Sequence, residues 1–181
     1  TTIPGSSSHI RKYLLRDLEI TRPNQVWCTD ITYIRMGRGF MYLTAIMDWH
    51  SRRILSWRLS NTMETGFCLS ALHDAIQATG TTPEILNTDQ GCQYTSDEWL
   101  NTVEGYGIKP SMDGKGCWVD NVLIERFWRT IKHDDVYLRD YTDGQQARQH
   151  IGRFISYYNG RKPHQSHGMT TPDSVYHEVA A

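Results

Sequence analysis

The chain has 181 residues, of which 39% are hydrophobic and 22% charged, a balance typical of one globular domain with a real core. Its formal net charge of −1 argues against a dedicated DNA-binding module, which is usually basic, but leaves room for an enzyme that touches DNA locally. No apolar run approaches the ~18 residues that span a bilayer, so no membrane partner is expected.

Turn signals and hydrophobic periodicity divide the chain into a leader, nine predicted elements and a tail. Strands are expected at 26–34, 40–48, 52–60, 84–88 and from 107 onward. Helices are expected at 64–79, 97–105, 119–135 and 143–158, the second of them capped by Ser96. The first three strands are joined by short turns and therefore form an antiparallel meander. The whole order predicts an α/β fold, a five-stranded mixed sheet with helices on both faces.

The flanking segments differ from this core in composition. Residues 1–24 are expected to form a linker with a short helical stretch, 25–160 the core, and 161–181 a basic C-terminal tail. The missing initial Met and the Gly/Ser-rich start suggest a piece of a longer protein. The Gly-rich residues 113–118 are expected to be mobile. None of the four cysteines forms a C-x-x-C pair, which favours reduced thiols and a cytoplasmic location.

Three carboxylates stand in distinctive settings. Asp30 lies inside the first strand, where Asp is depleted. Asp89 ends the fourth strand, where open α/β sheets place their ligands. Glu125 lies on the helix at 119–135, in a polar row opposite an apolar stripe; the row consists of Asn121, Glu125, Arg129 and Lys132. Taken singly, Asp89 could be a turn residue and Glu125 part of a solvated face.

Together the three acidic groups suit metal-dependent phosphodiester chemistry. Two Mg²⁺ or Mn²⁺ ions about 3.5–4 Å apart can activate an attacking oxygen and stabilise a leaving oxygen. Hard oxygen ligands suit these ions, and substrate phosphates complete the sites, so two ions are expected with DNA bound. Without metal the carboxylates repel one another, and at least one pKa should rise. Asp48 is interpreted as a turn or capping group, and Asp113 and Asp120 as caps.

The motifs around these carboxylates resemble those of bacterial insertion-sequence transposases whose catalytic core is similar to retroviral integrase. The matching stretches run from Pro23 to Tyr33, from Asn87 to Ser96, from Ser111 to Lys132 and from Tyr157 to His164. The resemblance implies a ribonuclease-H-like fold and a catalytic, metal-binding triad of Asp30, Asp89 and Glu125. It also matches Lys132 to a basic residue seven positions after the Glu. The upstream helix-turn-helix region of that family has no counterpart here.

The resemblance implies a DNA transposase core that cleaves and transfers DNA strands during integration. Its expected partners are the element ends and target DNA, bound at the bacterial nucleoid by a homo-oligomer assembled on DNA. The expected DNA-contacting residues are Lys132, Arg129, Asn121 and Lys115. Two alternatives are a stand-alone ribonuclease-H-like nuclease, which cuts without joining ends, and a non-catalytic DNA-binding or assembly module.

Overall fold

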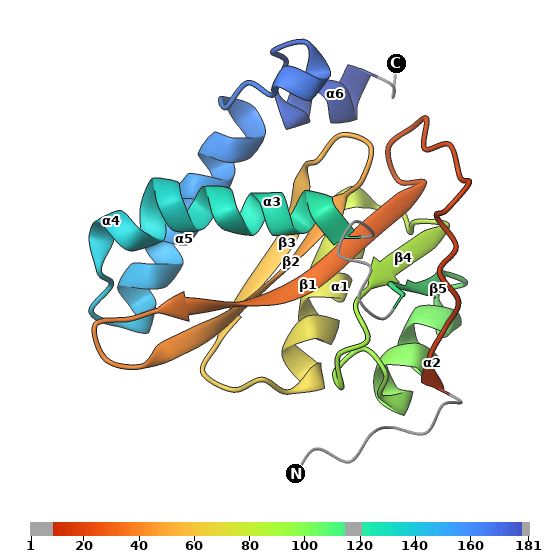
Figure 1. Ribbon diagram of the computed structural model, residues 1–181, viewed down its shortest axis with the longest axis horizontal. Helices are drawn as coiled ribbons and strands as arrows, with labels where there is room; N and C mark the ends of the chain where they lie inside the picture. The colour runs from red at the N-terminus through yellow and green to blue at the C-terminus, as the bar shows by residue number, and fades with distance from the viewer. Residues whose placement is uncertain (1–8, 115–120, 179–181) are drawn as a thin grey trace.

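A five-stranded sheet forms the centre of the computed structural model, which describes residues 9–114 and 121–178 (Figure 1). Its strand order is β3-β2-β1-β4-β5. The strands are β1 Val26–Arg35, β2 Phe40–Asp48, β3 Ile54–Ser60, β4 Ile85–Thr88 and β5 Lys109–Met112. β1 and β2, and β2 and β3, pair antiparallel, whereas β4 pairs parallel with both β1 and β5. The predicted mixed sheet and its meander are confirmed.

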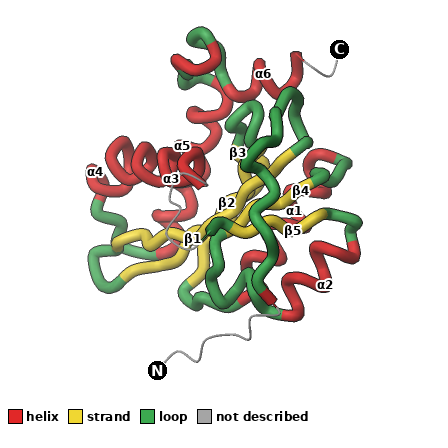
Figure 2. The backbone as a smooth tube through the Cα atoms, turned by 45° about the vertical axis from the view of Figure 1, so that its right-hand side comes forward, coloured by secondary structure: helices red, strands yellow, loops and turns green. Residues whose placement is uncertain are grey.

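Helices cover both faces of this sheet, as the turned view in Figure 2 shows. They are α1 Thr65–Thr79, α2 Asp97–Gly105, α3 Val122–Ile131, α4 Tyr137–Arg139, α5 Gly144–Gly160 and α6 Pro172–Glu178, with a π-helical turn at Lys132–Val136 and a 3-10 turn at Gln165–His167. Ser96 caps α2 as predicted, accepting a hydrogen bond from the N–H of Trp99 at 3.2 Å. Among the described residues, no helix has the length and apolar character needed to cross a membrane.

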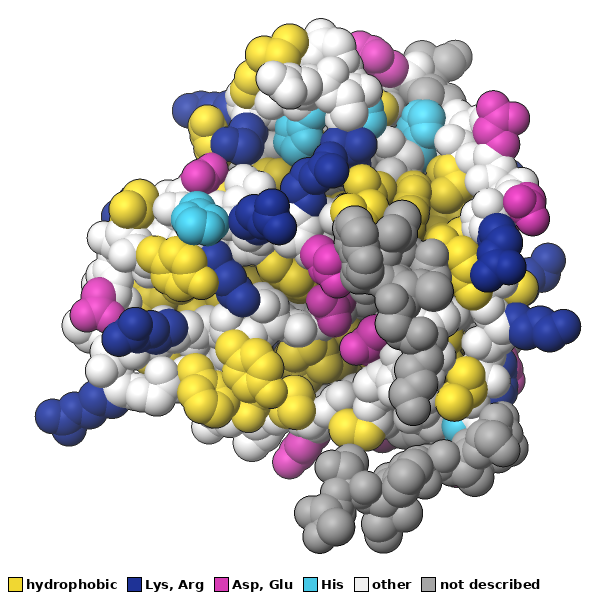
Figure 3. All heavy atoms as spheres, in the orientation of Figure 1, with side chains coloured by type: hydrophobic (Ala, Val, Ile, Leu, Met, Phe, Trp, Pro, Cys, Tyr) yellow, Lys and Arg dark blue, Asp and Glu magenta, His cyan; other side chains and the backbone are white. Residues whose placement is uncertain are grey.

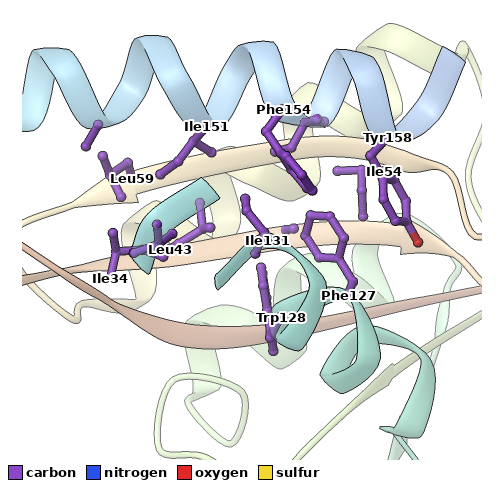
Figure 4. Close-up of a cluster of buried hydrophobic side chains, with 14 of the residues drawn as sticks. Ile34, Leu43, Ile54, Leu59, Phe127, Trp128, Ile131, Ile151, Phe154 and Tyr158 are labelled. Atoms are coloured by element: carbon purple, nitrogen blue, oxygen red, sulfur yellow. The ribbon is translucent and has the colours of Figure 1, made fainter. Parts of the chain in front are cut away.

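Strand alternation assigns the sheet's side chains to two cores. Trp27 and Cys28 are adjacent and fully buried, yet Trp27 packs with α1 and α2 while Cys28 packs with α3 and α5. Figure 4 shows the second of these cores: side chains of β1, β2 and β3 meet Phe127 and Ile131 of α3, and Phe154 and Tyr158 of α5 close it. β1 is thus covered on both faces at its start, where four consecutive residues, Val26, Trp27, Cys28 and Thr29, are all buried.

Three expectations are corrected. Of the short helical stretch predicted in residues 1–24, the described residues 9–24 show only a 3-10 position at His9, and Leu15 is buried against Val26 and Ile85 without regular structure. The helix predicted at 119–135 is α-helical only to Ile131, because the backbone then widens into the π-turn. The segment expected as a basic tail contains α6, which packs against α5. The predicted mobility of 113–118 falls mostly on residues outside the described ones.

Candidate active site

The sheet brings Asp30 and Asp89 to the same edge. Parallel pairing between β1 and β4 ends at Cys28 and Asn87. Asp30 lies two residues beyond Cys28, and Asp89 two residues beyond Asn87. Neighbouring strands run about 4.8 Å apart, so equal offsets from a paired position leave the two carboxylates side by side where β4 ends. Two residues separated by 58 others in the sequence therefore belong to one site.

Helix α3 adds the third carboxylate. Trp128 is 5% exposed, and its indole Nε1 donates a hydrogen bond to Oδ2 of Asp30 at 2.9 Å. Glu125, exposed, lies three residues earlier on the same helix. Figure 3 shows a group of acidic side chains near the middle of this face, with Lys and Arg side chains above it and to its left.

The pKa of Asp30 responds to both neighbouring carboxylates. The pKa of Asp30 is raised to about 6, first by burial, then by the charge of Asp89 and, more weakly, by that of Glu125. The indole N–H of Trp128 opposes this rise. Burial also raises the pKa of Asp89, against a hydrogen bond from the N–H of Gly91 at 2.9 Å. The expected pKa rise in a metal-free cluster is thus confirmed at Asp30.

Gly91 keeps Asp89 accessible. A Cβ atom at position 91 would lie 2.9 Å from Oδ1 of Asp89, closer than real Cβ atoms approach a neighbour. A larger residue would therefore displace the carboxylate or the turn that carries it. The turn Asp89-Gln90-Gly91 thus holds the carboxylate with a backbone N–H and leaves space beside it.

The three carboxylates suit a hard divalent cation, although they are not gathered around a single metal position. Carboxylate oxygens are the ligands that Mg²⁺ and Mn²⁺ prefer, and a cation would relieve the crowding that raises the pKa of Asp30. Within residues 9–114 and 121–178, no group of three or more His, Cys, Asp or Glu side chains is already closed around a metal position. The charges of Asp89 and Glu125 affect the pKa of Asp30, but the three carboxylates are farther apart than side chains that already share one ion.

Cationic side chains line a cavity beside Glu125. Its volume is about 330 Å³, and its lining includes Glu125, Trp128, Arg129 and Lys132. In the described part of the chain, neither Arg129 nor Lys132 forms an ion pair. Burial lowers the pKa of the Lys132 ammonium, while the charge of Asp30 raises it. These two expected DNA-contacting residues therefore face open space next to the carboxylates.

Of the other two residues expected to contact DNA, Asn121 and Lys115, only Asn121 is among the described residues, and it does not line this cavity. Asn121 was predicted to lie in the exposed polar row of the helix, but it is 4% exposed. Its side-chain Oδ1 is buried without a hydrogen-bond partner among the described residues. Its burial departs from the polar-row pattern because the residue sits at the N-cap of α3, where a helical wheel no longer describes the direction of a side chain. Lys115 lies outside the described residues.

Neighbouring acidic residues have structural roles. Asp48 is fully buried and accepts hydrogen bonds from the N–H of Asn24 at 2.7 Å, and from the N–H and Oγ of Ser51 at 2.8 and 2.6 Å. Its predicted role as a turn residue is confirmed. Asp113 was interpreted as a cap, but it is 9% exposed and accepts from Nδ2 of Asn87 at 2.7 Å, which links β4 to the end of β5. Asp120 lies outside the described residues.

Trp128 is the site residue that the sequence analysis missed. A helical wheel drawn for an apolar and a polar stripe assigned it to neither. The spacing held a usable signal, since Trp128 lies three residues after Glu125 and therefore beside it on the helix. The acceptor for its N–H belongs to β1, 98 positions away in the sequence, and no helix pattern reports such a partner.

The comparisons with known proteins agree with this geometry. Two integrase core domain profiles match the chain, one over residues 20–116 and the other over 106–172. The sheet, the edge-clustered carboxylates and these matches define an integrase-type core. The chain belongs to the integrase core domain family.

Similar curated proteins are insertion-sequence transposases. The chain is 33% identical over 154 residues to the transposase for insertion sequence element IS904 of Lactococcus lactis, a match covering 84% of this chain and 61% of that protein. It is 29% identical over 162 residues to transposase InsF for insertion sequence IS3A of Escherichia coli, covering 88% and 56%. The chain thus spans little more than half the length of these relatives.

Similar solved structures are retroviral. The magnesium complex of the HTLV-2 integrase catalytic core domain, in its trimeric form, superposes with a TM-score of 0.71 at 24% identity, over 86% of this chain and 98% of that one. A chain of the simian T-cell lymphotropic virus intasome, in complex with PP2A regulatory subunit B56 gamma, gives a TM-score of 0.75 at 21% identity, over 93% and 57%. These likenesses confirm the expected ribonuclease-H-like fold.

Proposed function

We propose that this chain is the catalytic core of a DNA transposase that cleaves DNA strands and transfers them to a target, with Asp30, Asp89 and Glu125 as metal ligands. One observation supports this most directly: the ends of β1 and β4 bring Asp30 and Asp89 to one edge of the sheet, and Trp128 of α3, three residues after Glu125, bonds to Asp30 there. Burial raises the pKa of Asp30, and the charges of Asp89 and Glu125 raise it further. A soluble scaffold has no use for three interacting carboxylates there, because their repulsion costs stability. Perturbed carboxyl pKa values of this kind are common at functional sites.

The cofactor of this function is Mg²⁺ or Mn²⁺, with two ions bound once DNA is present. Bound divalent ions would supply the positive charge that favours attack and departure of the two oxygens at phosphorus. Asp30 and Asp89 contribute oxygens from fixed backbone positions, whereas Glu125 approaches from α3. Arg129 and Lys132, which lack ion-pair partners in the described structure, would bind phosphates flanking the reacting one.

DNA is the proposed partner in two roles, as element end and as target. Cutting and joining two element ends in one event requires two active sites, which a homo-oligomer assembled on DNA provides. The near-neutral charge of −1 means that this chain supplies little of the general DNA affinity itself. The proposed site of action is the bacterial nucleoid in the cytoplasm.

The test replaces Glu125→Gln, which keeps the side-chain shape but weakens a hard-metal ligand. Strand cleavage and strand transfer on oligonucleotide ends with Mn²⁺ should each fall more than about a hundredfold, since metal stabilises the transition state by several kcal/mol. Glu98 is an exposed Glu in the first turn of α2. Glu98→Gln is therefore the matched control and should retain activity. Residual activity of Glu125→Gln above about a hundredth of wild type would reject the triad. Cleavage without any strand transfer by wild type would favour a nuclease instead.

A further inference from the structure

Trp128 joins the hydrophobic core to the candidate active site. It is 5% exposed and packs in the core between α3, α5 and the sheet, with its ring 5.1 Å from that of Phe127. Figure 4 shows it on the side of this core away from α5. Its one polar atom, Nε1, donates to Oδ2 of Asp30 at 2.9 Å. A side chain of the hydrophobic core is therefore bonded directly to a proposed metal ligand.

We propose that Trp128 is a positioning residue that fixes Asp30, and with it Glu125, for divalent-metal binding; this inference rests on the proposed function. A carboxylate offers about four lone-pair sites on two oxygens. The indole N–H occupies one site on Oδ2, and the backbone N–H of Ile31 also hydrogen-bonds to the carboxylate, so about two lone-pair sites remain for a cation. Indole is a donor without an acceptor, so it orients the carboxylate and cannot compete with it for the metal.

The same hydrogen bond sets the direction of Glu125. Glu125 and Trp128 are three residues apart on α3, so their side chains differ by ~60° around the helix axis and ~4.5 Å along it. Packing of Phe127 and Ile131 alone would tolerate small rotations of α3, because apolar contacts are non-directional. A directional bond from Trp128 to β1 removes that freedom. The positions of Asp30 and Glu125 relative to each other are thereby fixed before a metal ion binds.

Phenylalanine at this position would keep most of the packing and lose the hydrogen bond. Trp128→Phe is therefore the test, and Trp27→Phe is its matched control. Trp27 is fully buried, and its Nε1 also donates one hydrogen bond, to Oδ1 of Asn24 at 3.0 Å, but on the other face of β1. Both variants lose the same volume and one indole bond. They differ in whether the bond reaches a proposed metal ligand.

Mn²⁺ affinity measured by calorimetry in the presence of uncleaved element-end DNA is the first readout. Outer-shell partners of metal ligands typically contribute about 10–100-fold in affinity, so Trp128→Phe should weaken Mn²⁺ binding by at least about tenfold and Trp27→Phe by less than about twofold. The value of kcat should fall in Trp128→Phe, while KM for DNA stays within about twofold. Equal Mn²⁺ affinities in the two variants would overturn the positioning role. Abolition of Mn²⁺ binding by Asp89→Asn separately tests the proposed function.

A second measurement keeps the inference testable if Trp128→Phe fails to fold. The indole proton of Trp128 can be assigned in a ¹⁵N–¹H spectrum by its loss in Trp128→Phe or by comparison of single Trp variants, and a charge-assisted bond to Asp30 should place it downfield. Asp30→Ala should move this resonance upfield and leave that of Trp27 in place. Mg²⁺ added with DNA should also shift the Trp128 resonance. A Trp128 resonance indifferent to both changes would overturn the inference.

Discussion

At the scale of single residues, Asp30 combines a functional need with a cost in stability. The folded-state pKa is raised to about 6 from an ordinary value of 3.8, mainly by burial. A raised pKa means that the protonated form is favoured by folding. The stabilising contribution of the protonated carboxyl is fully present below pH about 4 and is lost as the pH rises through about 6.

Replacing Asp30→Asn should therefore stabilise the metal-free protein, because the amide cannot ionise. In EDTA, the free energy of unfolding at pH 8 should rise by about 1–3 kcal/mol over wild type, and the gain should shrink as the pH falls towards 4. Urea denaturation at several pH values measures this. The exposed Asp17→Asn should show no such trend. A variant that is less stable than wild type at pH 8 would contradict the electrostatic account.

Single residues also show what the sequence could and could not predict about the site. Asp30 was recognisable because an acidic residue inside an apolar strand is unusual, and Asp89 because it ends a strand. Trp128 was not, because its partner is defined by the packing of α3 on β1. Asn121 was misplaced because helix periodicity fails at a cap. The sequence thus indicated which carboxylates the fold brings to one edge of the sheet, but not the hydrogen bonds that position them.

At the scale of elements, α3 and the π-turn that follows it together line the cavity beside the candidate active site. The π-turn begins at Lys132, and its buried Asp135 accepts hydrogen bonds from Nε of Arg139 at 2.5 Å and from the hydroxyl of Tyr141. These bonds hold the widened turn in place. No pattern of apolar residues distinguishes a π-turn from the next turn of an α-helix, so the predicted helix continued through it.

Lys132 is expected to bind a DNA phosphate from this edge. It lies seven residues after Glu125, ~10 Å along the helix, and lines the same cavity. Lys132→Ala should weaken DNA binding by a similar factor for all sequences and lower the salt slope by about one unit. Binding isotherms over a range of salt concentrations give the slope.

An exposed lysine on β5 provides the comparison for this experiment. Lys109→Ala removes the same charge from a different part of the sheet, and its salt slope should stay that of wild type. If Lys132 acts only on the helix dipole, Lys132→Ala should instead lose well under about 1 kcal/mol of stability and leave the salt slope unchanged. That outcome would refute the phosphate contact.

At the scale of the whole molecule, the C-terminal segment is built into the fold by contacts that cross most of the sequence. Arg53 pairs with Asp173 at 2.6 Å, and the hydroxyl of Tyr176 donates to Oδ1 of Asn24 at 3.0 Å. Local periodicity predicted the strands and α5 because their own neighbours determine them. Partners 120 and 152 positions apart are set by topology, so a polar tail was expected where α6 docks.

Another long-range link joins α5 to the edge strand β3. The side chain of Asn159 accepts a hydrogen bond from the N–H of Ile54 at 2.9 Å and donates one to its carbonyl oxygen, also at 2.9 Å. Ile54 is 3% exposed, and Asn159 is 9% exposed. The amide thus satisfies the backbone groups of a strand that has no neighbouring strand on that side in the described part of the chain.

Asn159→Ala should consequently destabilise the protein although it removes no apolar contact of note. A buried N–H and a buried carbonyl would lose their partners, and each unsatisfied group costs about 1–3 kcal/mol, so a total loss of about 2–4 kcal/mol is expected. The urea midpoint should fall with the slope unchanged, since the surface exposed on unfolding is nearly the same. Asn101→Ala, at an exposed position on α2, should change the free energy of unfolding by less than about 0.5 kcal/mol. A loss equally small for Asn159→Ala would show that α5 is held by its apolar face alone.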